Sequence, residues 1–462
     1  MSKIPVIAIF DIGKTNKKLF LFDEKYNMVY EKSESFAETQ DEDGDACEDL
    51  PLLTEWVKKS LLEVSHMKEY SLKAINFSAY GASFVHIDRE GKPVAPLYNY
   101  LKPYPEKLKK QFYGKYGNEL VFAMHTASPV LGNLNSGLQL YFLKNEKPEL
   151  FNKIHYSLHL PQYLSFLVTG RRYSDITSIG CHTGLWNFSK NHYHEWLKKE
   201  DISKKLAPIF PSDQLMQTDF NKKPLLCGVG LHDSSAALIP YLSNFTEPFV
   251  LISTGTWCIS LNPFNQTNLT AEELEQDCLC YMEYKGKAIK ASRLFAGYEH
   301  EQQIKRLADY FNVAPDYYKT ILFDANTVAK LKMNSSLKTD KKKPMMQQSA
   351  FGLRDLSAFK NYAEAYHQLM IDLIEQQVIS TNLVLKKGTV KRIFLDGGFS
   401  RNSIYMHLLA SAYPEIEIYA ASIAQASALG AALAVHPYWN KKNTPADLIE
   451  LKYYTASEAI ST

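Results

Sequence analysis

Two aspartates stand at positions where a carboxylate has chemical uses. Asp11 follows residues 6–10, a continuous apolar run with β-branched members that is typical of a buried strand. A carboxylate at the end of such a strand is costly unless it binds something, and Mg²⁺ is a natural partner in phosphate chemistry. Asp233 follows His232 before an Ala-rich stretch, where it would be either the N-cap of a helix or a general base toward a hydroxyl group.

Three glycine-bearing turns, each after a predicted buried strand, could bind an anion. They occupy residues 11–16, 253–256 and 396–402. Glycine permits close approach and positive φ, so each turn could present several backbone N–H groups, and serine or threonine hydroxyls add donors. None has the spacing of a P-loop or of a dinucleotide-binding G-x-G-x-x-G motif. One such turn alone is most often a plain connection, but three turns together with two placed aspartates favour phosphate chemistry.

The elements that must position these residues follow from the hydrophobic pattern. Strands are predicted at residues 18–22 and 27–33, after the run at 6–10, so that the first turn joins two strands. Apolar residues at helical spacing from 53 to 64 predict a helix that covers this sheet. The acidic residues between 38 and 49 are interpreted as a solvated loop.

A domain boundary is predicted near residue 228. A polar break precedes a new apolar segment there, and the chain then enters the Ala-rich stretch that follows Asp233. The predicted domains are residues 1–228 and 229–462. In the first of them, two short strands flank the turn at residues 80–83.

The second half repeats the strand–turn–strand form of the first half, at residues 249–261. A long amphipathic helix is predicted around residues 366–378, and a buried strand at 392–395 leads into the third turn. Ser400 is a predicted N-cap for the next helix, and residues 424–434 form a small-residue helix. This mixture of strands and helices predicts the α/β class.

Composition excludes several classes of protein. The 462 residues carry 52 lysines and arginines against 50 aspartates and glutamates, so no basic excess would recruit nucleic acid or a membrane surface. No apolar run is long enough to span a membrane, and the first residues do not resemble a secretory signal. The six cysteines are too sparse for a disulfide scaffold, and Cys278 and Cys280 lack partners for a metal site. We expect a cytoplasmic protein with reduced thiols, whose basic loop at 337–346 is a solvated insertion rather than a nuclear address.

Five segments in order along nearly the whole chain resemble the motifs of the FGGY family of carbohydrate kinases. They are the first phosphate motif, the segment with the catalytic aspartate, the second phosphate motif, the adenosine motif and the C-terminal helix signature. The matching residues are Asp11-Ile12-Gly13-Lys14-Thr15-Asn16, Gly230-Leu231-His232-Asp233-Ser234-Ser235-Ala236, Ser253-Thr254-Gly255-Thr256-Trp257, Asp396-Gly397-Gly398-Phe399-Ser400-Arg401-Asn402 and Gln425-Ala426-Ser427-Ala428-Leu429-Gly430-Ala431-Ala432.

The resemblance implies two RNase H-like domains of the actin/hexokinase superfamily, with ATP and sugar in the cleft between them. It implies ATP-dependent, Mg²⁺-assisted phosphorylation of a sugar hydroxyl, with Asp233 as the base and with Asp11 and Asp233 at the metal. The residues that it places at ATP are Gly13, Lys14, Thr15, Asn16, Thr254, Gly255, Thr256, Gly397, Gly398 and Asn402. Lys14 departs from the commoner residue of the motif and would either stabilise the transferring phosphoryl group or point away into solvent.

Within the family, the chain looks most like rhamnulokinases and fuculokinases, which act on 6-deoxy-ketohexoses. This likeness implies a sugar site at Gly81, Ala82, Ser83, Tyr98 and His232. Ser83 replaces an aspartate of that group, and Asn99 and Tyr100 replace an arginine and an aspartate. A pentulose such as xylulose or ribulose is therefore an alternative substrate.

Two further classes are alternatives to a kinase. A non-catalytic, nucleotide-gated binding protein would lack the sugar segment and the His-Asp pair, and a sugar-sensing regulator would carry a DNA-binding domain, for which no basic segment precedes Ile4. Small-molecule sugar and ATP are the expected partners, and a homodimer is left open.

Overall fold

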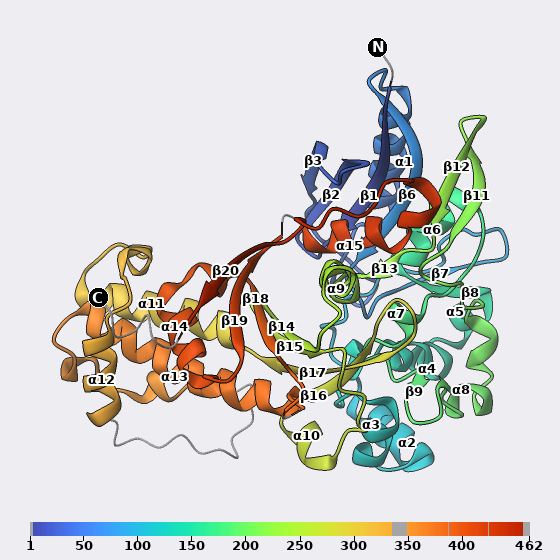
Figure 1. Ribbon diagram of the computed structural model, residues 1–462. Helices are drawn as coiled ribbons and strands as arrows, with labels where there is room; N and C mark the ends of the chain where they lie inside the picture. Colours follow the sequence, from blue (N-terminus) through green and yellow to red (C-terminus); the bar gives the residue numbers. More distant parts are fainter. Residues whose placement is uncertain (1–2, 335–348, 387, 424, 456–462) are drawn as a thin grey trace. The chain divides into compact units, whose positions relative to one another are not determined.

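The computed structural model describes residues 3–334, 349–386, 388–423 and 425–455 (Figure 1). The predicted basic loop at 337–346 lies outside these residues. Within them, no helix combines the length and the apolar character that crossing a bilayer requires. All six cysteines are buried, and none forms a disulfide.

The chain forms two compact units, and neither is one unbroken stretch of sequence. The first unit combines residues 1–244, 280–288 and 424–448, and the second combines 245–279, 289–423 and 449–462. The first unit therefore runs past the predicted boundary at residue 228 and recruits two later segments. One of them carries α15 (Ala426–Ala434), which lies beside β1 (Ile4–Ile12) although their sequence positions are far apart (Figure 1).

The first unit is built on a mixed sheet with the strand order β11-β12-β6-β1-β2-β3, in which β13 also pairs with β6. The strands β1 and β2 are antiparallel, whereas β1 and β6 are parallel. Besides β1, the strands are β2 (Asn16–Asp23), β3 (Met28–Ser35), β6 (Tyr70–Ala79), β11 (Leu215–Phe220), β12 (Lys223–Gly228) and β13 (Leu231–His232). The helices of eight or more residues in this unit are α1 (Leu50–His66), α2 (Glu106–Tyr116), α3 (Glu119–Thr126), α4 (Ser136–Glu146), α6 (Leu160–Thr169), α9 (Asp233–Asn244) and α15.

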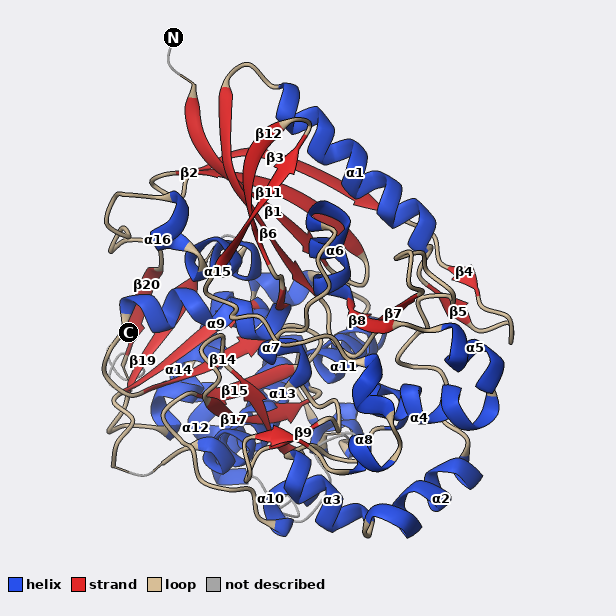
Figure 2. Ribbon diagram, turned by 90° about the vertical axis from the view of Figure 1, so that its right-hand side faces the viewer, coloured by secondary structure: helices blue, strands red, loops and turns tan. Residues whose placement is uncertain are grey.

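Helices cover both faces of this sheet, which explains why residues 6–10 of β1 are apolar at every position rather than at every second one. Val6, Ala8 and Phe10 pack with buried residues of α1 and α6 on one face (Figure 2). On the other face, the Asn76 amide donates to the backbone carbonyl of Ala431 in α15 at 2.9 Å. The predicted strands and the predicted helix over residues 53–64 are confirmed.

The second unit repeats the construction of the first. Its strands β14 (Phe249–Thr254) and β15 (Cys258–Asn262) form an antiparallel pair, and β18 (Arg392–Gly397) lies parallel to β14, as β6 lies to β1. The sheet continues through β17 (Ala288–Leu294), β19 (Glu417–Ser422) and β20 (Glu450–Tyr454). Its longer helices are α11 (Ala296–Phe311), α12 (Ala325–Asn334), α13 (Tyr362–Val384) and α14 (Ser403–Ala412). The predicted strand–turn–strand repeat and the α/β class are confirmed.

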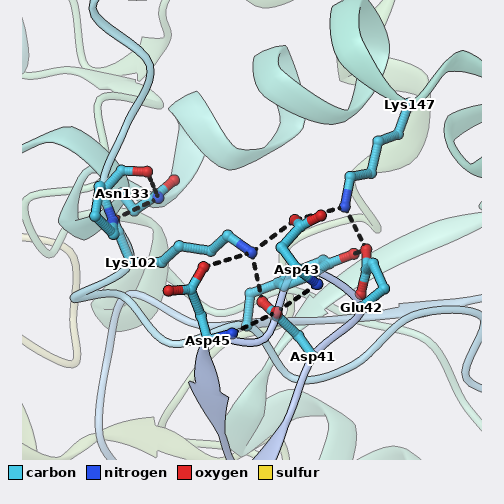
Figure 3. A network of polar contacts seen from close by, with 9 residues as sticks. Asp41, Glu42, Asp43, Asp45, Lys102, Asn133 and Lys147 are labelled. Carbon is cyan, nitrogen blue, oxygen red and sulfur yellow. Dashed lines mark hydrogen bonds and ion pairs between the residues drawn. The ribbon is translucent and has the colours of Figure 1, made fainter.

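The interpretation of the acidic segment at 38–49 as a solvated loop holds for the exposed Glu38, Glu42 and Asp43 and is wrong for the buried Asp41 and Glu48. It contains the short strands β4 (Thr39–Gln40) and β5 (Ala46–Cys47), and the side chain of Asp41 is only 1% exposed. The ammonium group of Lys102 lies 2.5, 2.8 and 3.0 Å from carboxylate oxygens of Asp41, Asp43 and Asp45 (Figure 3). A cation from a distant segment therefore neutralises carboxylates that the local sequence would leave to solvent.

The predicted N-cap at Ser400 is also wrong. A short 3₁₀ turn, η6 (Gly398–Arg401), intervenes, and Asn402 caps α14 by accepting from the backbone N–H of Tyr405 at 3.0 Å. The hydroxyl of Ser400 instead turns back and donates to the carbonyl of Gly397 at 2.8 Å.

We expect Asn402→Ala to lower the free energy of unfolding by about 1 kcal/mol, the usual effect of removing an N-cap acceptor. The change also removes the hydrogen bond that the Asn402 amide donates to the Tyr366 hydroxyl at 2.7 Å. Urea denaturation followed by circular dichroism measures the loss. Ser400→Ala is the matched control, and an equal or larger effect at Ser400 would contradict the assignment of the cap.

Candidate active site

Three parallel strands of the first unit end at the same edge of its sheet. In the β1–β6 pairing Asp11 is opposite Ser78, and in the β13–β6 pairing His232 is opposite Ala79. Side chains that follow the carboxyl ends of parallel strands share one edge, which is where ligands bind in open α/β sheets. The first turn, the turn at residues 80–83 and Asp233 are thus brought together by backbone pairing alone.

The two aspartates at this edge share an unfavourable electrostatic environment. Burial raises the pKa of Asp11 to about 6, and the negative charge of Asp233 adds to the rise, while a hydrogen bond from the Ser427 hydroxyl at 2.8 Å opposes it. Burial also raises the pKa of Asp233 to about 6, against hydrogen bonds from Ser234. Both carboxylates are hard oxygen donors whose charges are poorly solvated, so the pair fits Mg²⁺, which would relieve both costs.

The contacts of Asp233 differ from those of an N-cap. The helix α9 begins at Asp233 itself, and the carboxylate accepts from the N–H and the hydroxyl of the next residue, Ser234, at 2.6 and 3.3 Å. An N-cap side chain accepts instead from the second or third residue of the helix. The side chain is 36% exposed, so it remains reachable from solvent.

Of the predicted sugar-site residues, Gly81 packs directly against His232. A Cβ atom on Gly81 would lie 2.7 Å from Cδ2 of His232, so glycine is what allows the imidazole to sit there. Ala82 adopts the left-handed region with φ of 61°. Burial lowers the pKa of His232 to about 4, so the imidazole is neutral near pH 7.

Ser83 stands where the rhamnulokinases and fuculokinases that the chain resembles have an aspartate, and its side chain is uncharged. It is buried, and its hydroxyl lies 3.5 Å from the carbonyl of Tyr98, to which it donates. The hydroxyl of Tyr98 in turn donates to Glu42. Tyr98 and Ser83 therefore belong to one buried polar group, linked to the acidic segment that Figure 3 shows.

Lys14 in the first turn is engaged in an ion pair. Its ammonium group lies 2.6 Å from Glu38, and both side chains are partly exposed. The turn itself is closed by the N–H of Gly13, which donates to the carbonyl of Asn16 at 2.9 Å, and the Asn16 side chain accepts from Ser35 at 2.8 Å. Thr15 is exposed at the tip of the turn.

In the second unit, the predicted second phosphate motif and the predicted adenosine motif interlock. Thr254 is opposite Gly397 in the parallel pair of β14 and β18, and its hydroxyl donates to the carbonyl of Asp396 at 2.6 Å and accepts from the N–H of Phe399 at 3.1 Å. Gly397 has φ of 90°, and a Cβ atom there would lie 1.9 Å from the carbonyl oxygen of Thr254. Gly255, Thr256 and Gly398 continue the same edge beside them.

Sequence reasoning missed several residues that shape these edges. Gly297 at the start of α11 has no space for a side chain, because its Cβ would lie 1.8 Å from the carbonyl oxygen of Gly255. The role of Ser427 at Asp11 depends on a contact across 416 positions. Cys181 and His182 approach His232 from another loop. Contacts between residues far apart in the sequence leave no local sequence pattern. A search for a cysteine directly followed by a histidine would have found Cys181-His182 but not its proximity to His232.

Models of one family match most of the chain. The N-terminal domain of the FGGY family of carbohydrate kinases matches residues 6–224, and the carbohydrate kinase FGGY C-terminal domain matches residues 246–444.

Curated relatives match at low identity over part of their length. A rhamnulokinase of Halalkalibacterium halodurans is 22% identical over 267 residues, which cover 54% of this chain and 52% of the relative. A probable L-xylulose kinase of Pasteurella multocida is 26% identical over 265 residues, which cover 54% of each. The chain thus spans about half the length of the curated relatives it matches.

Solved structures match over nearly the whole chain. A carbohydrate kinase from Novosphingobium aromaticivorans has a TM-score of 0.80 at 21% identity, covering 98% of this chain and 95% of that one. A ligand-bound xylulose kinase from Lactobacillus acidophilus has a TM-score of 0.78 at 17% identity, covering 99% and 95%. These likenesses confirm the predicted fold, the two-domain α/β architecture of the actin/hexokinase type.

Proposed function

Because the chain belongs to the FGGY family of carbohydrate kinases, we propose that it transfers the γ-phosphoryl group of ATP to a hydroxyl group of a ketose. The observation that carries this proposal is the pair of carboxylates with raised pKa, Asp11 and Asp233, at one sheet edge beside Gly81 and His232. An aspartate with a raised pKa is a stronger base than an ordinary one and is still ionised near pH 7.

In the proposed reaction, the Asp233 carboxylate takes the proton of the sugar hydroxyl while the oxygen of that hydroxyl attacks the γ-phosphorus of ATP. The new P–O bond forms while the bond to the β-phosphate oxygen breaks, and ADP leaves. Asp11 and Asp233 would hold Mg²⁺, which supplies charge neutralisation for the phosphates. Phosphoryl transfer depends chiefly on positioning and electrostatics, and the sheet pairing of β1, β6 and β13 supplies the positioning of these groups.

The nucleotide is proposed to use both units. Backbone N–H groups of Lys14, Thr15 and Asn16 would meet the phosphates, and Gly13, whose own N–H closes the turn, would allow their close approach. In the second unit Thr254, Gly255 and Thr256 would lie at the phosphates, and Gly397, Gly398 and Asn402 would lie against the nucleoside. Because Lys14 is already paired with Glu38, it would contribute to phosphate binding only by exchanging that partner.

We propose a 6-deoxy-ketohexose, L-rhamnulose or L-fuculose, as the substrate, with a pentulose as the alternative. The likeness to a rhamnulokinase supports the deoxyhexulose, whereas the uncharged, buried Ser83 in place of an aspartate is the reason that the pentulose is the alternative. Both substrate classes occur in the names of curated relatives.

The test is ADP release from Mg-ATP in the presence of L-rhamnulose, L-fuculose, L-xylulose, D-ribulose or glycerol, each over a range of concentrations. The highest kcat/KM with L-rhamnulose or L-fuculose is expected. A clear preference for a pentulose or glycerol would overturn the deoxyhexulose assignment, and no release above the ATP blank with any ketose would argue against the kinase itself.

We expect kcat/KM to rise with pH through an apparent pKa near or somewhat below 6. Asp233 must lose its proton to act as the base, and burial raises its pKa to about 6, whereas bound Mg²⁺ acts in the opposite direction. His232 stays neutral over this range because burial lowers its pKa to about 4. A profile of kcat/KM against pH at constant ionic strength measures this rise. A kcat/KM that is already constant from about pH 5 upward would contradict the assignment of Asp233 as the base.

A further inference from the structure

We propose that Cys181, His182 and His232, with Asp233 as the fourth ligand, form a binding site for Zn²⁺. In the part of the chain that the structure describes, the first three are the one group of three or more histidine, cysteine or acidic residues whose ligand atoms lie close enough together to hold a metal ion. The site lies within the first unit and is separate from the oxygen donors proposed for Mg²⁺, except that it shares Asp233. The expectation that Zn²⁺ at this site inhibits the enzyme rests on the proposed function.

The distances suit a small tetrahedral ion. One ligand atom from each of Cys181, His182 and His232 lies within 4.8 Å of the others. The Cys181 sulfur is 3.1 Å from Nε2 of His232, and the same Nε2 is 3.3 Å from Oδ1 of Asp233. Tetrahedral Zn²⁺ with sulfur and nitrogen ligands spaces its ligand atoms roughly 3.3–3.8 Å apart. Small side-chain rotations therefore complete the geometry.

The hydrogen bonding of His182 prepares it as a ligand. Its Nδ1 lies 3.1 Å from the carbonyl oxygen of Leu134, which can only accept, so Nδ1 carries the hydrogen and Nε2 keeps its lone pair. A backbone carbonyl that fixes the tautomer in this way is the usual outer partner of a metal-bound histidine. The backbone of His182 is in the left-handed region with φ of 39°, and its ring lies at right angles to that of His232.

The same residues do not form a nucleophilic Cys-His-Asp relay. In such a relay the two partners contact opposite nitrogens of the imidazole, so that a proton passes across the ring. Here Cys181 and Asp233 both approach Nε2 of His232. A thiolate and two imidazoles whose ligand atoms lie within 4.8 Å of one another, with a carboxylate oxygen 3.3 Å from one imidazole, suit a metal ion instead.

The donor set selects against the ion that the kinase reaction needs. Mg²⁺ takes oxygen ligands and dehydrates reluctantly, whereas thiolate and imidazole favour Zn²⁺. Cys181 and His232 are buried, and the partly exposed Asp233 side chain gives the ion a route inward. A bound Zn²⁺ would occupy the carboxylate lone pairs that the proposed base needs, and the Cys181 thiol would release its proton on binding.

The binding test uses Co²⁺ and Zn²⁺ with the full-length protein and no nucleotide. Co²⁺ should produce a thiolate-to-cobalt charge-transfer band and tetrahedral d–d bands that Zn²⁺ abolishes. Cys181→Ser and His182→Gln should weaken Zn²⁺ binding by about 100-fold or more and remove these bands. Cys227→Ser, which changes another buried thiol in the same unit, should leave them unchanged. No band in the wild type, or an unchanged band in Cys181→Ser, would overturn the proposal.

The inhibition test compares ADP release with and without buffered Zn²⁺ at saturating Mg²⁺, each variant against its own zinc-free rate. Zn²⁺ should inhibit the wild type and Cys227→Ser, and it should inhibit His182→Gln much less. Because His182→Gln tests the site independently, the experiment remains decisive even if Cys181→Ser fails to fold. Inhibition of His182→Gln equal to that of the wild type would overturn the inhibitory role. Absence of turnover in every variant, with the cobalt bands intact, would refute the proposed function and leave the zinc site supported.

Discussion

Asp233→Asn is expected to lower kcat by about 10²–10⁴-fold, the usual contribution of a placed base, while leaving the fold intact. The amide has the shape of the carboxylate and cannot accept the proton. The fold binds the protonated form of Asp233 preferentially, because burial raises its pKa to about 6. Above that pH the ionised carboxylate costs stability, so the neutral amide should hold or raise the melting temperature at pH 8.

Steady-state ADP release and thermal denaturation measure the two effects on the same preparation. Asp219→Asn, on the exposed face of β11 in the same unit, removes an equal charge and is the matched control. A near-native kcat in Asp233→Asn would rule Asp233 out as the base. A loss of activity accompanied by a large drop in melting temperature would instead indicate a structural role.

Gly430→Ala is expected to destabilise the first unit by about 1–3 kcal/mol, the usual cost of overpacking. A Cβ atom at this position in α15 would lie 1.8 Å from the carbonyl oxygen of Ala236 in α9, and a backbone atom cannot swing aside. The two helices also carry functional groups, since α9 begins at Asp233 and Ser427 of α15 bonds to Asp11. Separating the helices should therefore lower kcat as well.

Gly114→Ala is the matched control, because Gly114 also lies within a helix, α2, and its Cβ would meet open space. Alanine there should stabilise the protein by up to about 1 kcal/mol, the difference in helix propensity. The two substitutions are thus expected to shift the urea midpoint in opposite directions. A shift of Gly430→Ala toward stability would contradict the close packing of α9 and α15.

Elements whose residues interact locally could be predicted from the sequence. Residues 6–10 of β1 are all apolar because both faces of the strand are covered, and the apolar residues of α1 recur at helical spacing because only one face of that helix is covered. Among the glycines of the three predicted turns, Gly397 has the positive φ that glycine favours, whereas Gly13 and Gly255 do not. The sequence predicted a contact with the nucleotide for Asn402 and placed the N-cap of the next helix at Ser400. Both residue types are common N-caps, and only the 3₁₀ turn η6, in which Ser400 lies, shows that the helix begins after Asn402.

Features that depend on distant partners could not be predicted in this way. Asp41 is buried only because Lys102 reaches it, and the charge of the segment alone indicated a solvated loop. The sheet edge that carries Asp11 and Asp233 was anticipated only as separate motifs. The pairing of β1, β6 and β13 brings them together, and the charge of Asp233 then raises the pKa of Asp11. Whether each motif residue contacts ATP or sugar stays a prediction.

The composition of the first unit from three separate stretches of chain has a consequence for biosynthesis. The unit needs residues 424–448, and α15 brings the Ser427 hydroxyl that bonds to Asp11. On the ribosome, the sheet of β1, β2 and β6 therefore emerges long before the helix that covers one of its faces. We expect nascent chains that end before residue 424 to expose this face, so that the last tenth of translation decides when the protein becomes resistant to proteases.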